Sequence, residues 1–251
     1  MFIYLNNRAL LKISGNDAES FLQSQLSNDI LKLDTSSIQL SAYCQHQGKI
    51  LSLFWVLRQE EGFYLSFPMD VLDLIQSRLQ MFVMMSDVNI ENISDSYCQI
   101  GVVDETAPNA FRINKKLSVL IESKNYHSDS INYENFHWTK ACIDSFLPEV
   151  VLSTSEKFVP QMLNLDIDEL GVNFSKGCYP GQEVVARLHY LGSAKRRLFS
   201  FKSDQEMQVG DHLYCITSKT ALARGDRYKG SGIVVSKVKY NSLFYCLATL
   251  D

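Results

Sequence analysis

The chain has 251 residues, and 46% of them are hydrophobic, which suits one large domain or two to three small ones. The formal net charge of -4 gives no electrostatic reason to expect nucleic acid as the main partner. The apolar start at residues 1–5 is too short for the core of a secretory signal, and no apolar run reaches the roughly 18 residues of a membrane span. We therefore expect a cytoplasmic protein with no membrane association.

Six cysteines are spread along the chain without any C-x-x-C spacing, which argues against a zinc site or a thioredoxin-type motif. The chain is not short and cysteine-dense, so we expect free thiols rather than disulfides. No cluster of histidines and cysteines predicts a stable metal site. Because free cysteine is often buried, we expect five of the six to be small core residues and one to differ. The six are Cys44, Cys98, Cys142, Cys178, Cys215 and Cys246.

The first hundred residues alternate between strand and helix patterns. The polar stretch at 45–48 predicts a hairpin turn, and Pro68 suits the first turn of a helix. Apolar residues at helical spacing predict one helix over 18–26 and another over 71–82. This order predicts a mixed α+β layer with antiparallel pairing. The expected strands are 8–13, 37–44, 49–57, 63–67, 88–93 and 98–103.

The second half of the chain changes character. Residues 115–133 are polar and weakly patterned, which predicts short strands and a surface loop. A short helix is expected over 135–145. Beyond Phe199, short β-type runs separated by polar turns predict a small terminal β-barrel or sandwich. These runs are 198–201, 212–216, 232–238 and 243–248.

The stretch KGCYPGQE at 176–183 carries the most chemical information. A thiol becomes reactive when it ionises, and Lys176 is close enough in sequence to stabilise a thiolate at Cys178. Gly177 lets the backbone bend or a ligand approach. The alternative is that Cys178 is a buried cysteine in a tight turn, which is common for free cysteine.

The end of the same stretch leaves the local structure open. Pro180 and Gly181 predict a turn, after which a helix could begin and direct free backbone N–H groups towards Cys178. Gln182 and Glu183 would cap that helix or bind a ligand. Residues 184–190 could instead continue as a strand, and the sequence does not decide between the two.

The KGCYPGQE stretch resembles the signature of the YgfZ group of the folate-binding glycine-cleavage T-protein-like (GcvT-like) family, which includes mitochondrial iron–sulfur factors. Other segments agree, so that the resemblance covers almost the whole chain. They are the opening at 14–29 with its F-L-Q and N-D elements, the hairpin at 43–49, P-Q-x-x-N-L at 160–165, V-A-R at 185–187 and K-R at 195–196.

The resemblance implies an α+β T-protein-like fold around a central cavity, closed by a small C-terminal β-barrel. The implied domains are an N-terminal folate-binding α+β subdomain at 1–110, a second α+β subdomain at 111–194 that carries KGCYPGQE, and the barrel at 195–251. The resemblance also implies tetrahydrofolate binding and a role in the assembly or repair of iron–sulfur enzymes, including those that thiolate tRNA. Folate and client iron–sulfur proteins are therefore the expected partners.

The resemblance and the residue chemistry together give the candidate site. Cys178 is expected to be a redox thiol, a sulfur-handling nucleophile or a transient cluster ligand, with Lys176 tuning it. Trp138 could stack on a pterin, because flat aromatic side chains suit flat heterocycles, or it could be a core residue. Asn164 is a further candidate for the folate cavity. The residues expected to shape the turn are Gly177, Tyr179, Gly181, Gln182 and Glu183.

The sequence departs from the aminomethyltransferases of the family after the hairpin. Those enzymes carry an aspartate-bearing segment there, whereas residues 48–53 of this chain hold no carboxylate. Transfer of a carbon unit from an amine to folate needs a general acid or base within hydrogen-bond reach. We therefore expect an accessory protein, and a folate-dependent aminomethyl transferase is the alternative.

Charge is distributed unevenly between two neighbouring segments. Residues 144–169 hold six acids and one base, whereas residues 174–202 hold six bases and one acid. The simpler interpretation is that solvated faces pair with each other. The sharper one is an anion site for a folate glutamate tail or an RNA phosphate. The bases permit direct tRNA binding, but the acidic net charge does not favour it.

Overall fold

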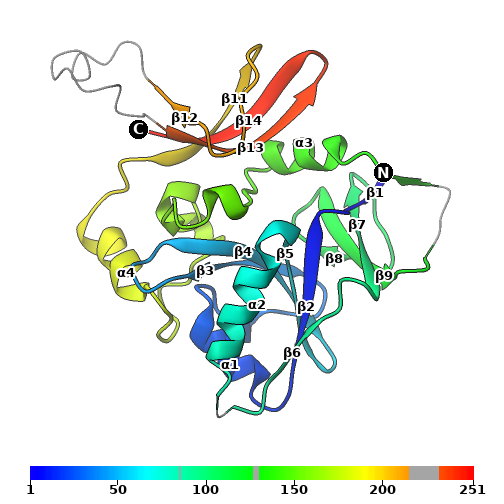
Figure 1. The fold of residues 1–251 in the computed structure, drawn as a ribbon, viewed down its shortest axis with the longest axis vertical. Coiled ribbons are helices and arrows are strands. Elements are labelled where there is room, and N and C mark those ends of the chain that lie inside the picture. Colours follow the sequence, from blue (N-terminus) through cyan, green and yellow to red (C-terminus); the bar gives the residue numbers. More distant parts are fainter. Residues whose placement is uncertain (85, 127–129, 215–231) are drawn as a thin grey trace.

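Three β-sheets form the framework of the protein in the computed structural model, which describes residues 1–84, 86–126, 130–214 and 232–251 (Figure 1). The predicted α+β class with largely antiparallel pairing is confirmed. None of the helices within these described ranges has the length and apolar character needed to cross a membrane.

The first sheet is built from sequence-local antiparallel pairs. Its strand order is β3-β4-β5-β2-β6. Helices α1 (Ala18–Gln25) and α2 (Leu72–Met81) bury their apolar sides in the same core as this sheet, so that Phe21, Ile75, Phe54 and Phe67 pack in one cluster. The strands are β2 (Arg8–Ser14), β3 (Ile38–Cys44), β4 (Ile50–Gln59), β5 (Gly62–Pro68) and β6 (Asn89–Asn92).

The second sheet joins the N-terminus to the middle of the chain, in the order β10-β1-β7-β9-β8. Strand β1 pairs with β7 in antiparallel fashion and with β10 in parallel fashion. The predicted domain boundary at residue 110 runs through this sheet, because β7 precedes it and β9 follows it. The strands are β1 (Phe2–Tyr4), β7 (Tyr97–Val103), β8 (Phe111–Arg112), β9 (Leu117–Ser123) and β10 (Ile131–Asn132).

The third sheet, in the order β11-β14-β13-β12, is a curled half-barrel at the C-terminal end. Helix α3 (Phe136–Asp144) lies beneath it and contacts β13 and β14 (Figure 1). Part of the predicted run at 212–216 lies outside the described residues. The strands are β11 (Arg197–Ser203), β12 (His212–Leu213), β13 (Gly232–Tyr240) and β14 (Leu243–Leu250).

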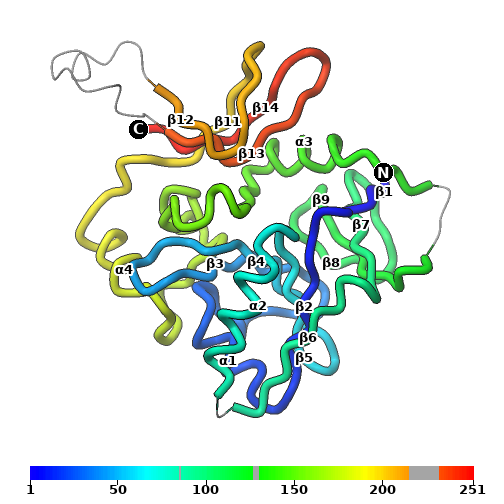
Figure 2. The backbone as a smooth tube through the Cα atoms, viewed as in Figure 1, coloured from blue at the N-terminus to red at the C-terminus, as the bar shows by residue number. Residues whose placement is uncertain are grey.

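The segment between α3 and β11 contains short helices and leads from beneath the third sheet around one side of the molecule (Figure 2). A central apolar core, which includes Trp55, Trp138, Leu117 and Leu247, joins all three sheets to this segment. The short helices are η3 (Leu152–Thr154), η4 (Pro160–Leu163), η5 (Ile167–Glu169) and α4 (Gln182–Leu191), and the first half of the chain adds η1 (Ile30–Lys32) and η2 (Met69–Val71).

Candidate functional site

Cys178 lies on the loop before α4, which we call the cysteine loop (residues 173–181). Its side chain is exposed, and the neighbouring residues 175 and 177 are exposed as well. The other cysteines in the described part of the chain, at positions 44, 98, 142 and 246, are buried. Cys215 lies outside that part. One thiol in the described structure is therefore accessible to solvent and to a partner.

Lys176 holds the cysteine loop against the end of α1. Its ammonium donates hydrogen bonds to the main-chain oxygens of Gln23 at 2.6 Å, of Asn28 at 3.0 Å and of Leu26. These oxygens lie at or just beyond the C-terminal end of α1, where helix carbonyls lack partners and a positive charge is favoured. Burial lowers the pKa of Lys176 to about 8, although Asp29 opposes the shift. The sequence did not indicate this anchoring role, and tuning of Cys178 by Lys176 stays a prediction.

Gly181 allows the cysteine loop to contact the hairpin between β3 and β4. Gly181 has a φ of +84°, and a Cβ atom there would lie 2.5 Å from the carbonyl oxygen of Gln45 and 2.7 Å from Cα of Gly48. A side chain at Gly181 would therefore force the loop away from the hairpin. Gly177 differs, because a Cβ atom there would meet nothing within 4 Å.

The last two residues of the motif, Gln182 and Glu183, begin helix α4. Residues 182–191 are helical, which settles the choice that the sequence left open between helix and strand. The N–H of Gln182 donates to the carbonyl of Tyr179 at 3.1 Å. Tyr179 is buried, its hydroxyl has no hydrogen-bond partner among the described residues, and burial raises its pKa. Glu183 is exposed in the first turn.

A cavity of about 380 Å³, which we call the Asn28 cavity, opens between the first sheet and the loops beside it. Its volume falls in the usual range of about 300–1,000 Å³ for small-molecule sites. Apolar and polar side chains share its wall. They come from the segment after α1 that includes η1 (Asn28, Lys32, Leu33), from the start of β3 and the residue before it (37–40), from β4 (Trp55), from the turn between β8 and β9 (113–114), from the loop after α3 (Ser145, Leu147) and from 169–170.

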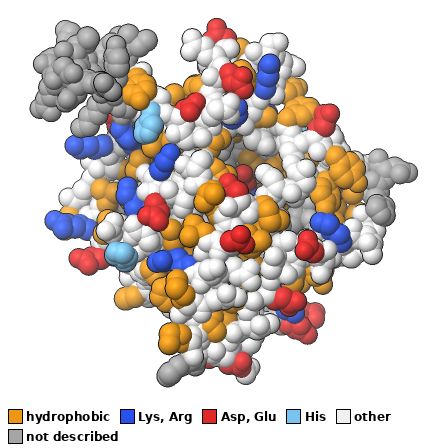
Figure 3. All heavy atoms as spheres, viewed as in Figure 1, with side chains coloured by type: hydrophobic (Ala, Val, Ile, Leu, Met, Phe, Trp, Pro, Cys, Tyr) orange, Lys and Arg blue, Asp and Glu red, His pale blue; other side chains and the backbone are white. Residues whose placement is uncertain are grey.

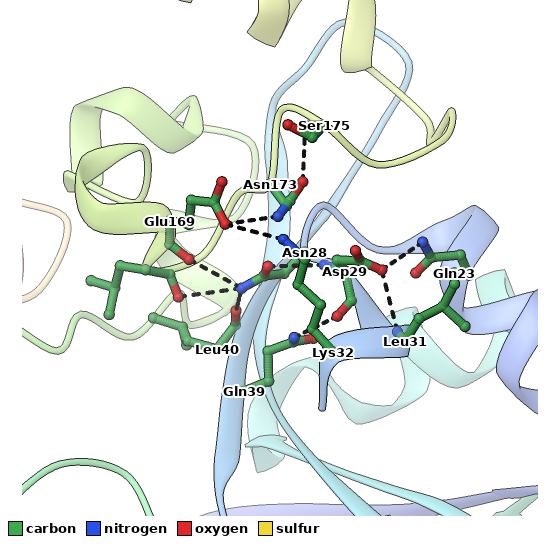
Figure 4. A network of polar contacts seen from close by, with 11 residues as sticks. Gln23, Asn28, Asp29, Leu31, Lys32, Gln39, Leu40, Glu169, Asn173 and Ser175 are labelled. Carbon is green, nitrogen blue, oxygen red and sulfur yellow. Dashed lines mark hydrogen bonds and ion pairs between the residues drawn. The ribbon is translucent and has the colours of Figure 1, made fainter. Parts of the chain in front are cut away.

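A polar network connects the wall of this cavity to the cysteine loop (Figure 4). The amide of Asn28 donates to the main-chain oxygens of Leu40 at 2.9 Å and Glu169 at 3.4 Å. The Glu169 carboxylate accepts a 2.8 Å bond from Asn173 and lies 3.6 Å from the Lys32 ammonium. Asn173 in turn accepts a bond from the backbone of the cysteine loop at residue 175. A ligand in the cavity would thus touch groups that also position the loop.

Trp55 is the tryptophan that lines the cavity. The Arg8 guanidinium lies 3.5 Å from its ring centroid, and Trp138 contacts it edge-on at a centroid distance of 5.8 Å. Trp138 itself is buried against Gly101, where a Cβ atom would lie 2.4 Å from the indole. It therefore packs behind the cavity wall and does not line the Asn28 cavity.

Asn164 also lies away from this cavity. Its backbone is left-handed, with a φ of 58°, and its amide donates to the carbonyl of Leu198 at 2.9 Å. The side chain thereby fastens η4 to the first residues of β11. Neither Trp138 nor Asn164 is brought together with Cys178 by a described contact.

Sequence reasoning missed several of the residues that line the cavity. Trp55 stands inside an apolar strand, where an aromatic residue usually signals only packing. Gln39 also lines the cavity, and its Oε1 atom is a buried acceptor without a partner among the described residues. Asn28 was noted as part of a family motif, but no role was given to its amide.

The segment after the hairpin glycine, residues 48–53, holds no carboxylate of its own. Ser52 is fully buried there, and its hydroxyl has no partner within the described chain. Glu169 is the one carboxylate among the described residues that line the Asn28 cavity. It comes from η5, more than a hundred residues further along the chain.

Several of the bases between 174 and 202 are held within the protein. Arg197 binds Asp166 with contacts of 2.5 and 3.0 Å, and Arg196 binds Asp251 at 2.8 Å. Lys and Arg side chains gather at the side of the molecule where α4 lies (Figure 3). The pair of Arg197 with Asp166 agrees with the interpretation that the acidic and basic segments neutralise each other. Across the described ranges, no three His, Cys, Asp or Glu side chains come together to hold a metal ion.

Comparison with known proteins places the chain in a family. Residues 5–142 match the family model described as the GCVT N-terminal domain. An uncharacterized protein of Haemophilus influenzae is 33% identical over all of this chain and 89% of its own length. The tRNA-modifying protein YgfZ of Klebsiella pneumoniae is 26% identical over 94% of this chain and 80% of its own length.

A solved structure has the same fold. The glycine cleavage system aminomethyltransferase T from Bartonella henselae superposes with a TM-score of 0.69 at 11% identity, covering 99% of this chain and 77% of the other. At this identity the likeness concerns the fold alone. The matched domain and the relatives that align over most of this chain show that the chain belongs to the YgfZ/GcvT-like family, and the common architecture agrees.

Proposed function

We propose that the protein is an accessory factor that binds a folate in the Asn28 cavity and supports iron–sulfur enzymes, including those that thiolate tRNA, through the thiol of Cys178. The observation that carries the proposal is the bond from Lys176 to the main chain of Asn28. It anchors the loop that bears an exposed thiol to the wall of a ligand-sized cavity. Relatives named as tRNA-modifying proteins support the tRNA branch of the proposal. We place this role in the cytoplasm.

The residues of the cavity fit a folate. A pterin needs an apolar surface for its ring and acceptors for its N–H groups, and the cavity offers Trp55 and the Glu169 carboxylate. Bound tetrahydrofolate would supply a nitrogen that carries one-carbon units. Trp138 would contribute by supporting Trp55, and Asn164 by holding η4 in place.

Direct binding tests the folate part of the proposal. Calorimetry with tetrahydrofolate should give a single site in the wild type. In a Trp138→Phe variant the only remaining tryptophan is Trp55, so quenching of its fluorescence would report on the cavity. Absence of both heat and quenching would contradict folate binding.

Replacement of the thiol tests the second part. In cells that lack the protein, Cys178→Ser should fail to restore the activity of iron–sulfur enzymes and the thiolated nucleosides of tRNA. Cys246→Ala is the matched control, because this thiol is fully buried in the third sheet. The free energy of unfolding of both variants, measured by denaturant titration, should lie within about 1 kcal/mol of the wild-type value. Full support by folded Cys178→Ser would remove the proposed role of the thiol.

Aminomethyl transfer remains the alternative chemistry, because Glu169 places a carboxylate in the cavity. One oxygen of this carboxylate, Oε2, is already engaged by Asn173 and Lys32. An assay for methylenetetrahydrofolate formation from an aminomethyl donor separates the two functions. We expect no turnover above the uncatalysed rate.

A further inference from the structure

Helix α4 packs on the rest of the protein with one side and exposes another. Val185 is fully buried in the central core, and its carbonyl accepts a 2.7 Å bond from the side-chain amide of Gln161. The exposed side, which we call the α4 face, has residues at the spacing that places side chains along one side of a helix. They are Val184 and Leu191, which are 41% and 83% exposed, together with the exposed Arg187 and the half-buried Leu188.

The α4 face is continuous with the cysteine loop. The helix begins directly after Gly181, the last residue of that loop, and Val184 in its first turn lies against the hairpin at Gly48, where a Cβ atom would be 3.1 Å from the Cβ of the valine. Near the other end of the helix, the ring of His189 stacks on Phe174 of the cysteine loop at a centroid distance of 3.7 Å and an angle of 17°. The loop therefore lies against α4 at both ends of the helix.

Positive charge accompanies the aliphatic residues. Arg187 is exposed within the face and Lys195 is exposed just beyond the end of α4, and neither forms an ion pair with another described residue. Glu183 is the only acid between positions 174 and 202. Lys and Arg side chains gather on this side of the molecule (Figure 3). A partner complementary to the face therefore carries acidic side chains beside apolar ones.

These two properties together favour a helix of another protein as the occupant. Val184, Leu188 and Leu191 stand at positions i, i+4 and i+7, which are the anchors used when helices recognise each other. A second copy of the same face would bring Arg187 against its own copy, which like-charge repulsion disfavours. Single-stranded RNA is held by phosphate contacts and by stacking on aromatic rings, which leaves the aliphatic row without a role.

We propose that the α4 face docks an acidic amphipathic helix of the client protein on which Cys178 acts. This inference rests on the proposed role of Cys178. The acidic side chains of the client helix bind Arg187 and Lys195, and its apolar side covers Leu191. Docking on α4 brings the client to the loop that bears the exposed thiol.

Thiol–disulfide exchange with helical peptides tests the docking directly. The probes are two peptides of about 20 residues, a length that supports a helix, one built from leucine and glutamate and the other from leucine and lysine. Each carries one cysteine as a mixed disulfide with thionitrobenzoate. The Cys178 thiol loses its proton to the buffer and attacks the peptide sulfur, which forms a protein–peptide disulfide and releases thionitrobenzoate, whose absorbance is followed. The Cys178→Ser variant gives the background from other thiols, and division by the rate with iodoacetamide corrects for changes in thiol reactivity.

The charge of the face should select the glutamate peptide. We expect the wild type to react with it about tenfold faster than with the lysine peptide at low salt, because complementary charges raise the rate of encounter. Added salt should reduce this difference. Arg187→Glu/Lys195→Glu should abolish it. The matched control Lys115→Glu/Lys116→Glu, which reverses two exposed charges on the turn between β8 and β9, should keep it.

The aliphatic row should contribute separately. Leu191→Ser removes the most exposed aliphatic side chain of the face and should slow the reaction with the glutamate peptide about fivefold. Leu31→Ser, at an exposed leucine of η1, is the matched control and should react like the wild type.

Several results would overturn the docking proposal. They are equal corrected rates of the wild type with both peptides, a preference that survives in Arg187→Glu/Lys195→Glu, and a rate unaffected by Leu191→Ser. A wild-type dimer that Leu191→Ser dissociates in sedimentation would assign the face to a second copy, and tRNA binding that Arg187→Glu/Lys195→Glu abolishes but Leu191→Ser keeps would assign it to RNA. None of these results bears on the role of the thiol, which the complementation by Cys178→Ser decides.

Discussion

The ammonium of Lys176 donates to the main-chain oxygen of Asn28, while the side chain of Asn28 lines the cavity. One residue thus lines the cavity with its side chain and holds the cysteine loop with its carbonyl. Two parts of the candidate site that are 148 positions apart in sequence are joined at a single residue.

Loss of the Lys176 anchor should weaken the fold and release the loop. Lys176→Met keeps much of the apolar stem but leaves the carbonyls of residues 23, 26 and 28 without this partner. We expect the free energy of unfolding to fall by about 1–3 kcal/mol. Urea unfolding measures this, with Lys195→Met as the exposed control. A change below the error of the control would contradict the anchoring role.

The same residue predicts a pH dependence. Its pKa is about 8 in the folded protein, whereas that of an unfolded chain is near 10.4. Between these values the unfolded state binds more protons, so the contribution of Lys176 to the free energy of unfolding rises with pH. The difference between wild type and Lys176→Met should therefore grow from pH 8 to pH 10. A difference that shrinks over this range would show that burial does not dominate at this site.

Substitution by alanine should destabilise the protein at Gly181 but not at Gly177. Gly181→Ala places a methyl group against backbone atoms of the hairpin at a positive φ, so we expect a loss of about 1–3 kcal/mol. Gly177→Ala has open space around the new methyl group and should be neutral within about 0.5 kcal/mol. Thermal unfolding of both variants tests this pair. Equal stabilities would contradict the close contact of the loop with the hairpin.

The cysteines should differ in their rate of alkylation. Burial raises the pKa of Cys44 to about 12 and also raises that of Cys142, so both remain protonated and enclosed at pH 8. Cys178 is exposed and should react with iodoacetamide at least tenfold faster than either. Peptide mass mapping over time gives the rate at each position. Slow labelling of Cys178 in the folded protein would contradict its exposure.

Glu169 should contribute to folate affinity. Glu169→Gln keeps the size of the side chain but removes the negative charge that a pterin N–H would meet, and we expect about a tenfold loss of affinity. Asp168→Asn is the matched control, since this neighbour is exposed and lies outside the cavity lining. Calorimetry compares the two variants. Equal affinity of both with the wild type would place the pterin elsewhere.

Much of the fold could be predicted from local pattern. The apolar spacing at 18–26 and 71–82 predicted α1 and α2, and the polar stretch at 45–48 predicted the hairpin. Each of these signals lies within a single helix or a single pair of neighbouring strands. The role of Lys176 could not be predicted in this way. Its partners are main-chain carbonyls, which every residue carries and no side-chain pattern marks.

The cavity was hidden from sequence reasoning for a related reason. Its wall is assembled from separate segments between positions 28 and 170, and Trp55 and Glu169 meet there only after the sheets pack. Trp138 attracted attention because aromatic residues can stack on a ligand, but Gly101 leaves space for its ring inside the core. The exposed thiol at Cys178 was the part of the site that the motif itself indicated.

The parallel pairing of β1 with β10 also sets an order for folding during synthesis. Phe2 and Ile3 lie beside Ile131 and Asn132, so the second sheet cannot be completed until about half of the chain has left the ribosome. The hairpins of the first sheet have short loops and can form earlier. The edge of β1 that pairs with β10 must therefore remain unpaired until residues 131 and 132 have been made.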